Sequence, residues 1–221
     1  IMNRYMTAMT AKIIENEGTL DKYIGDAQMA FWNAPLDDKD HALHAVKTGL
    51  DMLEDLDEFN KEIAQENIPA FGMGLGINTG DVVVGNMGSS QRFDYTCLGD
   101  SVNLASRLEG QSKNYGVRIV LGPKTAEYVK DAYPVVEMDC IAVKGKTEGV
   151  KIYTVGQTVP YMHNEYLKEY YRGSWGKAIV WARKMINDDS VTIKHYYELM
   201  IERMEEGIPP EWDGTYRATS K

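Results

Sequence analysis

The sequence has few cysteines, no long apolar run and no excess of basic charge, and each lack excludes a class of protein. Only two of its 221 residues are cysteine, which argues against a disulfide framework and favours a reduced, cytosolic setting. No apolar run approaches the roughly 18 residues that span a bilayer. The net charge of −9 argues against nucleic acid or an anionic membrane surface as the main partner. A site for an anionic ligand would therefore depend on local cations or on metal ions.

The rest of the composition is that of a globular protein able to bury a core. Hydrophobic residues make up 43% of the chain and charged residues 26%. The length of 221 residues suits one domain with an appendage, or two small domains.

Apolar periodicity predicts helices and strands in an order typical of an α+β protein. We expect Gly18 to end the first helix, and the turn Asn78-Thr79-Gly80 to join two strands of a hairpin. Helices over an antiparallel sheet are therefore expected, with a small helical C-terminal extension. The expected helices are 1–17, 37–63, the segment around Asn103 and Arg107, and 123–132; the expected strands are 19–24, 28–32, 71–77, 82–85, 117–121, 135–143 and 150–155.

The C-terminal part differs from the rest in its many tyrosines and tryptophans. The segment Tyr170 to Ala178 resembles the helix–turn–helix of one tetratricopeptide-like unit, with further helices near 178–185 and 192–206. One such unit cannot bury its own apolar face, so we expect it to pack on the main domain or on a partner. The domains predicted from the sequence are 1–156 and a helical tail, 157–221.

The segment Phe93 to Arg107 holds the most informative pattern of the chain. Asp100 or Ser101 can cap a helix, which places Asn103 and Arg107 one turn apart on the same face. An amide donor beside a guanidinium suits a sugar oxygen next to a phosphate. The alternative is an ordinary amphipathic helix with a solvated arginine.

A second pattern surrounds Asp26, in the segment Gly18 to Ala30. Gly25 permits a tight turn, and the carboxylate of Asp26 at its tip is suited to a hard divalent cation. Lys22 lies four residues earlier, an even spacing that puts both side chains on one face of a strand unless the turn breaks it. Plain turn chemistry for Asp26 and a solvated surface role for Lys22 are the alternatives.

Together these segments resemble the catalytic domain of class III adenylate and guanylate cyclases, in the bacterial branch that carries threonine at the purine site. The resemblance covers residues 1 to about 156 and implies a ferredoxin-like, or palm-type, sheet. It implies that Asn103 orients the ribose, that Arg107 stabilises charge in the transition state, and that Asp26 helps to hold two divalent cations, Mg²⁺ or Mn²⁺.

The same resemblance assigns the residues that contact the nucleotide. Lys22 and Thr96 take the two purine-selecting positions and point to ATP, because a lysine donor suits N1 of adenine, whereas guanine carries a donor there. A space-filling strand residue is the alternative for Thr96. Lys144 and Lys146 resemble the loop near the terminal phosphates, with Lys144 preferred, and Arg92 is a further candidate for phosphate contact.

The resemblance implies attack of the ribose 3′-oxygen on the α-phosphate, which yields cyclic AMP and pyrophosphate. In this family the metal aspartates come from one subunit and the nucleotide-contacting groups from the other, so a homodimer with shared sites is expected. The end of the chain, Pro209 to Gly214, resembles that of bacterial cyclases with an upstream sensor. This likeness implies a cytoplasmic domain in a protein anchored in the inner membrane.

One family feature has no counterpart in the printed sequence. The first metal aspartate and its opening strand, which precede the first helix in the family, do not appear. With Asp26 alone the two-metal site is half built, so we expect the printed polypeptide to have little or no cyclase activity.

Three other functions compete with an adenylate cyclase. A catalytically silent dimerisation or regulatory module would have lost the substrate residues, but they are present. A guanylate cyclase is opposed by Lys22. A helical-repeat scaffold would require more than the single repeat found in the tail.

Overall fold

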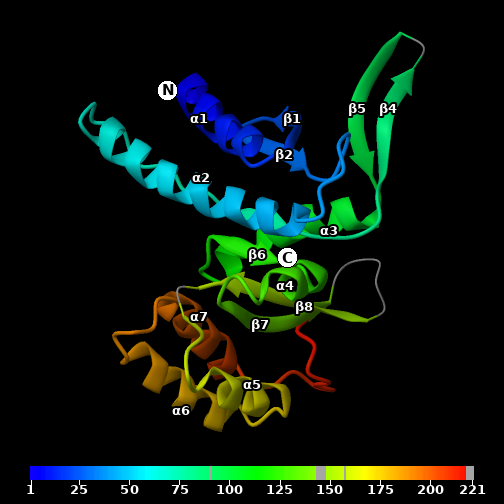
Figure 1. The fold of residues 1–221 in the computed structure, drawn as a ribbon. Coiled ribbons are helices and arrows are strands. Elements are labelled where there is room, and N and C mark those ends of the chain that lie inside the picture. Colours follow the sequence, from blue (N-terminus) through cyan, green and yellow to red (C-terminus); the bar gives the residue numbers. More distant parts are fainter. Residues whose placement is uncertain (90, 143–147, 157, 218–221) are drawn as a thin grey trace. The chain divides into compact units, whose positions relative to one another are not determined.

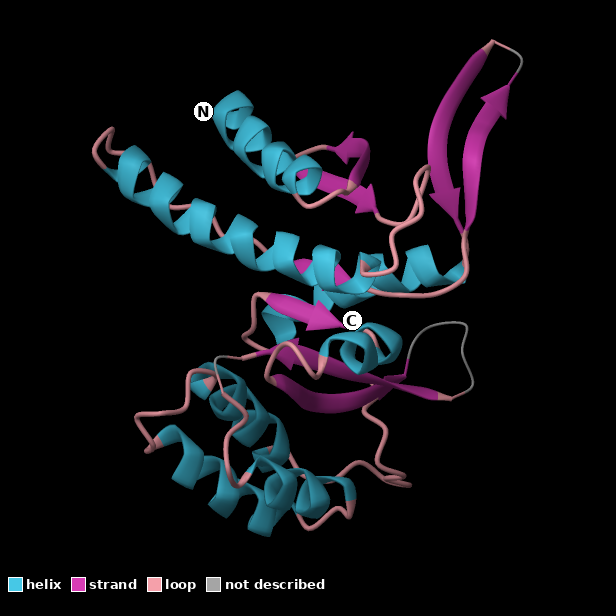
Figure 2. Cartoon of the chain, viewed as in Figure 1, coloured by secondary structure: helices cyan, strands magenta, loops and turns pink. Residues whose placement is uncertain are grey.

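The computed structural model describes residues 1–89, 91–142, 148–156 and 158–217, which form an α+β fold (Figures 1 and 2). The α+β class with covering helices and C-terminal helices, predicted from the sequence, is confirmed. The chain divides into two compact units, 1–73 with 79–104 and 74–78 with 105–221. These units do not test the domain boundaries predicted from the sequence, so the domains 1–156 and 157–221 stay a prediction. No described helix combines the length and apolar character that crossing a membrane requires.

The first unit is built on two helices and two hairpins. The helix α2 buries the apolar stripe expected from its sequence, including Val46, Met52 and Leu56. An ion pair of 3.3 Å between Lys12 and Asp55 joins α1 to α2. The elements are α1 (Met2–Glu15), β1 (Thr19–Ile24), β2 (Ala27–Phe31), α2 (His41–Ala64), β4 (Val83–Ser89), β5 (Arg92–Leu98) and the start of α3 (Asp100–Asn114).

The end of α1 corrects one expectation. The residue in the left-handed region is Glu17, with φ of 62°, and not Gly18. Gly18 is needed for close packing instead: a Cβ atom there would lie 2.8 Å from Ile13 and from the Trp32 ring.

The hairpin expected over 71–85 is wrong. The strand β3 (Leu75–Ile77) pairs in parallel with β6 (Ile119–Leu121), while β4 pairs antiparallel with β5 in the long ribbon seen in Figure 2. Gly76 explains the first pairing, because a Cβ atom there would lie 2.2 Å from the α3 backbone at Ala105. The strand therefore runs directly against α3, and only a residue without a side chain permits that approach.

The second unit holds a four-stranded sheet in the order β3-β6-β8-β7. Its β3–β6 pair is parallel and its other pairs are antiparallel, so the sheet is mixed rather than antiparallel throughout. The helix α4 begins at a proline in its first turn, as expected. The remaining elements of the sheet region are α4 (Pro123–Val129), β7 (Val135–Ala142) and β8 (Gly149–Val155).

Three helices of the tail pack against the sheet of the same unit (Figure 1). They are α5 (His163–Tyr171), α6 (Trp175–Ile186) and α7 (Lys194–Glu205). Tyr170 stacks on Trp175 with ring centroids 5.8 Å apart, and Tyr196 donates a hydrogen bond to the Met138 carbonyl of β7 at 2.6 Å. The backbone at Tyr216 also pairs with β7. Of the two arrangements expected for the tail, packing on the main domain or on a partner, the structure shows contact with the sheet strand β7.

Candidate functional site

A buried carboxylate, Asp21, brings together the two residues predicted to read a purine. Thr96 Oγ1 on β5 donates a hydrogen bond of 2.6 Å to Asp21 Oδ2, and the ammonium of Lys22 lies 3.2 Å from Asp21 Oδ1. The Asp21 side chain is fully buried, whereas that of Lys22 is 41% exposed. All three residues lie in the first unit. Lys22 and Thr96 thus lie at the two oxygens of one carboxylate, with the lysine partly open to a ligand.

A β-bulge explains how the adjacent residues Asp21 and Lys22 come to lie near each other. Leu20 pairs with Ala30 and Lys22 with Met29, so Asp21 is an extra residue in the β1–β2 ladder. Neighbouring residues on a regular strand point to opposite faces, but a bulge re-aims a side chain. The bulge allows the ammonium of Lys22 to approach the carboxylate of Asp21.

Asp26 lies in the turn of the same hairpin, as the sequence predicts. The β1–β2 pairing closes at Ile24 and Ala27, and Gly25 takes a left-handed φ of 64° that favours glycine. Asp26 is exposed. The pKa of Tyr5 on α1 is raised, first by the burial of Tyr5 and then by the negative charge of Asp26.

The predicted ribose and phosphate residues lie on one exposed face of α3. Asn103 and Arg107 are both exposed one helical turn apart, while Leu104 and Leu108 are buried. The apolar positions anchor the helix and leave the amide and the guanidinium free to meet a ligand.

Of the remaining predicted residues, the structure describes Arg92. Arg92 is the first residue of β5. Its side chain is 84% exposed, and its Nε lies 3.9 Å from Asp94 Oδ1. Lys144 and Lys146 lie outside the described residues. Their phosphate contacts stay predictions.

Cys97 follows Thr96 and is buried beside Asp21, to which its backbone N–H donates at 3.3 Å. Burial, and then the neighbouring Asp21, raise the pKa of the Cys97 thiol. The thiol is therefore held neutral, which argues against a nucleophilic cysteine at this place.

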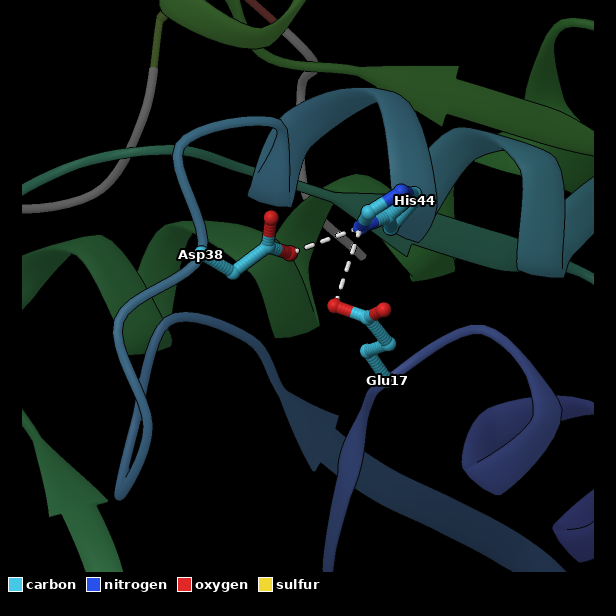
Figure 3. A group of neighbouring side chains, drawn as sticks. All are labelled: Glu17, Asp38 and His44. Carbon is cyan, nitrogen blue, oxygen red and sulfur yellow. Dashed lines mark hydrogen bonds and ion pairs between the residues drawn. The ribbon is translucent and has the colours of Figure 1, made fainter.

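Three side chains near the start of α2 have the donor types of a metal site (Figure 3). His44 Nδ1 lies 2.8 Å from Asp38 Oδ2 and 3.9 Å from Glu17 Oε2. Glu17 is exposed, and the Asp38–His44 hydrogen bond also serves to fix the loop before α2. Within the described ranges, Asp26 belongs to no group of three metal-ligating side chains.

A pocket of about 260 Å³ lies in the second unit, between α4, β7, β8 and α5. Pro123, Val136, Tyr153 and His163 are among its lining residues. Among the described residues, none that is predicted for the site lines it.

Comparison with known proteins identifies the family. Residues 1–157 match the model of the adenylate and guanylate cyclase catalytic domain, which is most of the chain. The chain belongs to this cyclase family. The cyclase domain is 34% identical over 155 residues to adenylate cyclase 1 of Rhizobium meliloti (strain 1021) and 37% identical over 161 residues to an adenylate cyclase of Anabaena cylindrica. Each match covers 70% of this chain.

Solved cyclase structures resemble the cyclase domain in both sequence and fold. The adenylyl cyclase CyaB from P. aeruginosa matches with a TM-score of 0.64 and 32% identity, over 70% of this chain and 80% of that one. The guanylyl cyclase Cya2 matches with a TM-score of 0.65 and 34% identity, over 74% of this chain and 81% of that one. The chain spans 23% and 31% of the two curated relatives above.

The cyclase family generally uses divalent metal ions, but the described residues do not by themselves build a two-metal site. Asp26 offers one hard carboxylate, and each ion needs several oxygen ligands. The fit is therefore incomplete.

Asp21 is the residue that reasoning from the sequence missed. An acidic residue within a predicted strand is unusual, since aspartate is depleted in strands. That signal could have identified it, but the bulge that turns it toward Lys22 depends on pairing with β2 and is not visible locally.

Proposed function

We propose that this chain is the catalytic domain of an adenylate cyclase, which converts ATP to 3′,5′-cyclic AMP and pyrophosphate. The observation that carries the proposal is the meeting of Lys22 and Thr96 at the Asp21 carboxylate. An ammonium donor complements the N1 acceptor of adenine and opposes the N1–H of guanine.

In the proposed reaction the ribose 3′-oxygen attacks the α-phosphorus. The new O3′–P bond forms as the bond between the α-phosphorus and the pyrophosphate oxygen breaks, and the hydroxyl proton passes to solvent water. Asn103 orients the ribose, and the donors of Arg107 stabilise the charge that grows on the phosphate oxygens. Their shared exposed face on α3 supports these roles.

We assign the remaining predicted residues to the same nucleotide. Asp26, exposed in a tight turn, is our candidate ligand for Mg²⁺ or Mn²⁺. Lys144, Lys146 and Arg92 are candidates for phosphate contact.

We also propose a homodimer with shared sites. Exposed apolar side chains in the first unit support an interface: Ile24 is 60% exposed, Val83 67%, Phe93 62% and Leu98 55%. Such side chains on hairpins are costly in water unless a partner covers them. Sedimentation equilibrium tests this, and a monomer at all concentrations would contradict it.

The larger setting is also a proposal. Since the curated relatives are three to four times longer than the matched segment, we propose that the domain acts in a larger signalling protein with an upstream sensor. A cytoplasmic domain of a protein anchored in the inner membrane fits this setting.

Two other functions need to be distinguished from it. A guanylate cyclase is a real alternative because the guanylyl cyclase Cya2 is as similar as CyaB. Lys22 opposes it, since its ammonium would face a donor on guanine. A silent cyclase-like module is the second alternative.

Cyclase activity with Mn²⁺ and either ATP or GTP tests the proposal, in this chain and in a version extended by the family's opening strand. We expect cyclic AMP from ATP in the extended protein, and Arg107→Ala to lower kcat by about 100- to 1,000-fold. Lys113→Ala, an exposed cation on the same helix, is the control. Cyclic GMP as the product would indicate a guanylate cyclase. No product from a dimeric protein would indicate a silent module.

A further inference from the structure

We infer that Asp21 sets the purine preference by holding the Thr96 hydroxyl so that it can only accept a hydrogen bond from a base. This inference rests on the proposed function and adds to it a residue that is not predicted to contact the nucleotide. Asp21 is thus a positioning residue.

The first step is the direction of the Thr96 hydrogen bond. A threonine hydroxyl has one proton to donate and two lone pairs that accept, so in isolation it can serve either purine. Here Thr96 Oγ1 donates that proton to Asp21 Oδ2 over 2.6 Å, and a carboxylate only accepts. The oxygen therefore has lone pairs left for a ligand and no proton.

The second step is that the orientation of Asp21 is itself fixed. Its Oδ2 also accepts the backbone N–H of Cys97 at 3.3 Å, and the side chain is fully buried. The bulge at Asp21 aims it at β5, since Leu20 and Lys22 take the ladder positions on either side. The carboxylate therefore has little freedom to turn away from Thr96.

The third step is the second carboxylate oxygen. Asp21 Oδ1 is buried and accepts no hydrogen bond from the described part of the chain, while the Lys22 ammonium lies 3.2 Å away. A buried acceptor without a hydrogen bond is costly, and native folds seldom keep one that does nothing. Here its charge holds the ammonium of Lys22 at the carboxylate that also binds Thr96, and the N–H donors of the lysine remain available to a ligand.

These steps give a complementary pair for adenine. The six-position amino group of adenine is a donor and matches the acceptor Thr96, and its N1 is an acceptor and matches Lys22. Guanine reverses both, with an oxygen at position six and a hydrogen on N1. By accepting the Thr96 proton, Asp21 leaves a hydroxyl that could donate or accept able only to accept, which disfavours guanine.

The experiment measures how ATP, GTP and inosine triphosphate displace a fluorescent ATP analogue, with Mn²⁺ present. Leucine has a shape similar to that of aspartate but no hydrogen-bond acceptor. In Asp21→Leu the Thr96 hydroxyl can therefore donate its proton to the six-position oxygen of guanine. We expect the ATP-to-GTP affinity ratio to fall by about tenfold, the worth of one hydrogen bond. Asp21→Asn should keep most of the ratio, because Cys97 N–H holds the amide oxygen toward Thr96.

Two controls separate this effect from general damage. Asp51→Leu removes a carboxylate of the same unit that pairs with Lys47 and Asn16, and should leave the ratio unchanged. In a Thr96→Val background, Asp21→Leu should no longer change the ratio, because the two residues act as a unit. An unchanged ratio in Asp21→Leu alone overturns the inference.

If Asp21→Leu does not fold, the unaltered protein still decides the question. Inosine triphosphate carries the six-position oxygen and N1–H of guanine without its 2-amino group, so it should bind as weakly as GTP. Binding as tight as that of ATP overturns the inference. Failure to bind ATP or GTP at all instead refutes the proposed function.

Discussion

The two compact units each bury an aspartate completely, and the two carboxylates are used differently. Asp139 in the second unit accepts from Tyr115 OH at 2.6 Å, Arg203 Nη1 at 2.7 Å and Tyr170 OH at 3.3 Å on Oδ2, and from Cys140 N on Oδ1. Asp21 in the first unit accepts on Oδ2 from Thr96 Oγ1, from Cys97 N and, at 4.0 Å, from Cys97 Sγ, and among the described residues it accepts none on Oδ1.

The difference distinguishes a structural carboxylate from the carboxylate that we propose positions the purine-binding residues. Burial raises the pKa of Asp139, and the adjacent Arg203 opposes that rise. Both Asp139 oxygens accept hydrogen bonds, from β7, from the residue after α3 and from the tail helices. The carboxylate therefore links those elements. Asp21 has an oxygen, Oδ1, that accepts no hydrogen bond from the described residues, and it lies beside Lys22 and Thr96, whose groups suit a purine base. A filled carboxylate holds a fold together, and a partly filled one orients its neighbours.

The largest effect is expected from Asp139→Asn. Removing its charge leaves Arg203, only 13% exposed, as a buried cation without an ionic partner. We expect a loss of about 3–5 kcal/mol in the free energy of unfolding, measured in urea. Asp213→Asn, which breaks the exposed pair with Arg217, should have little effect. Equal losses in the two variants would contradict a structural role for Asp139.

A second large effect concerns pH and His163, another buried group of the second unit. Its Nε2 must donate to the Glu137 carbonyl, which only accepts, and in the neutral ring its Nδ1 then accepts from Tyr197 OH at 2.8 Å. Burial lowers the pKa of His163 from 6.5 to about 4, although Glu137 opposes this.

The unfolded state therefore binds more protons between pH 6.5 and 4, and stability falls as the pH falls through that window. We expect His163 to account for about 3 kcal/mol of this loss. His163→Gln should flatten the pH profile of unfolding, whereas His195→Gln, at an exposed position, should leave it unchanged. Parallel profiles for the unaltered protein and His163→Gln would refute the assignment.

A smaller effect is expected at Tyr115, the residue directly after α3. Its hydroxyl donates to Asp139 and accepts from Arg203 Nη1 at 3.2 Å. Tyr115→Phe should lower the free energy of unfolding by about 2 kcal/mol, as for a hydrogen bond to a charged group. Tyr161→Phe, at a position that is 72% exposed, is the control. No change at Tyr115 would mean that Arg203, Tyr170 and the Cys140 N–H satisfy the carboxylate without it.

The sequence predicts local features of this protein well and long-range pairing poorly. The turn at Gly25 and the apolar stripe of α2 follow from neighbouring residues, and both are confirmed. The parallel pairing of β3 with β6 joins segments more than 40 residues apart, and no local pattern encodes it. The turn residues Asn78 to Gly80 therefore predict a hairpin that the chain does not form.

The same limit applies to the candidate site. Sequence motifs are sufficient to name Lys22, Thr96, Asn103 and Arg107, because the spacing of each motif can be read directly from one sequence. Asp21 could not, because its role depends on a one-residue slip in the β1–β2 register and on a contact with β5 some 75 residues away. Networks such as that of Asp139 likewise depend on packing between distant elements.

The smallest effect is expected from Asp21→Asn, and it is the sharpest test of the comparison. The amide oxygen can still accept from Cys97 N–H and Thr96, and Lys22 is 41% exposed and can turn to water. We expect the free energy of unfolding to change by less than about 1 kcal/mol, far less than for the same substitution at Asp139. Urea unfolding of the two variants side by side measures this. If both substitutions cost the same, Asp21 would be a second structural carboxylate, and its spare oxygen would have no bearing on the purine.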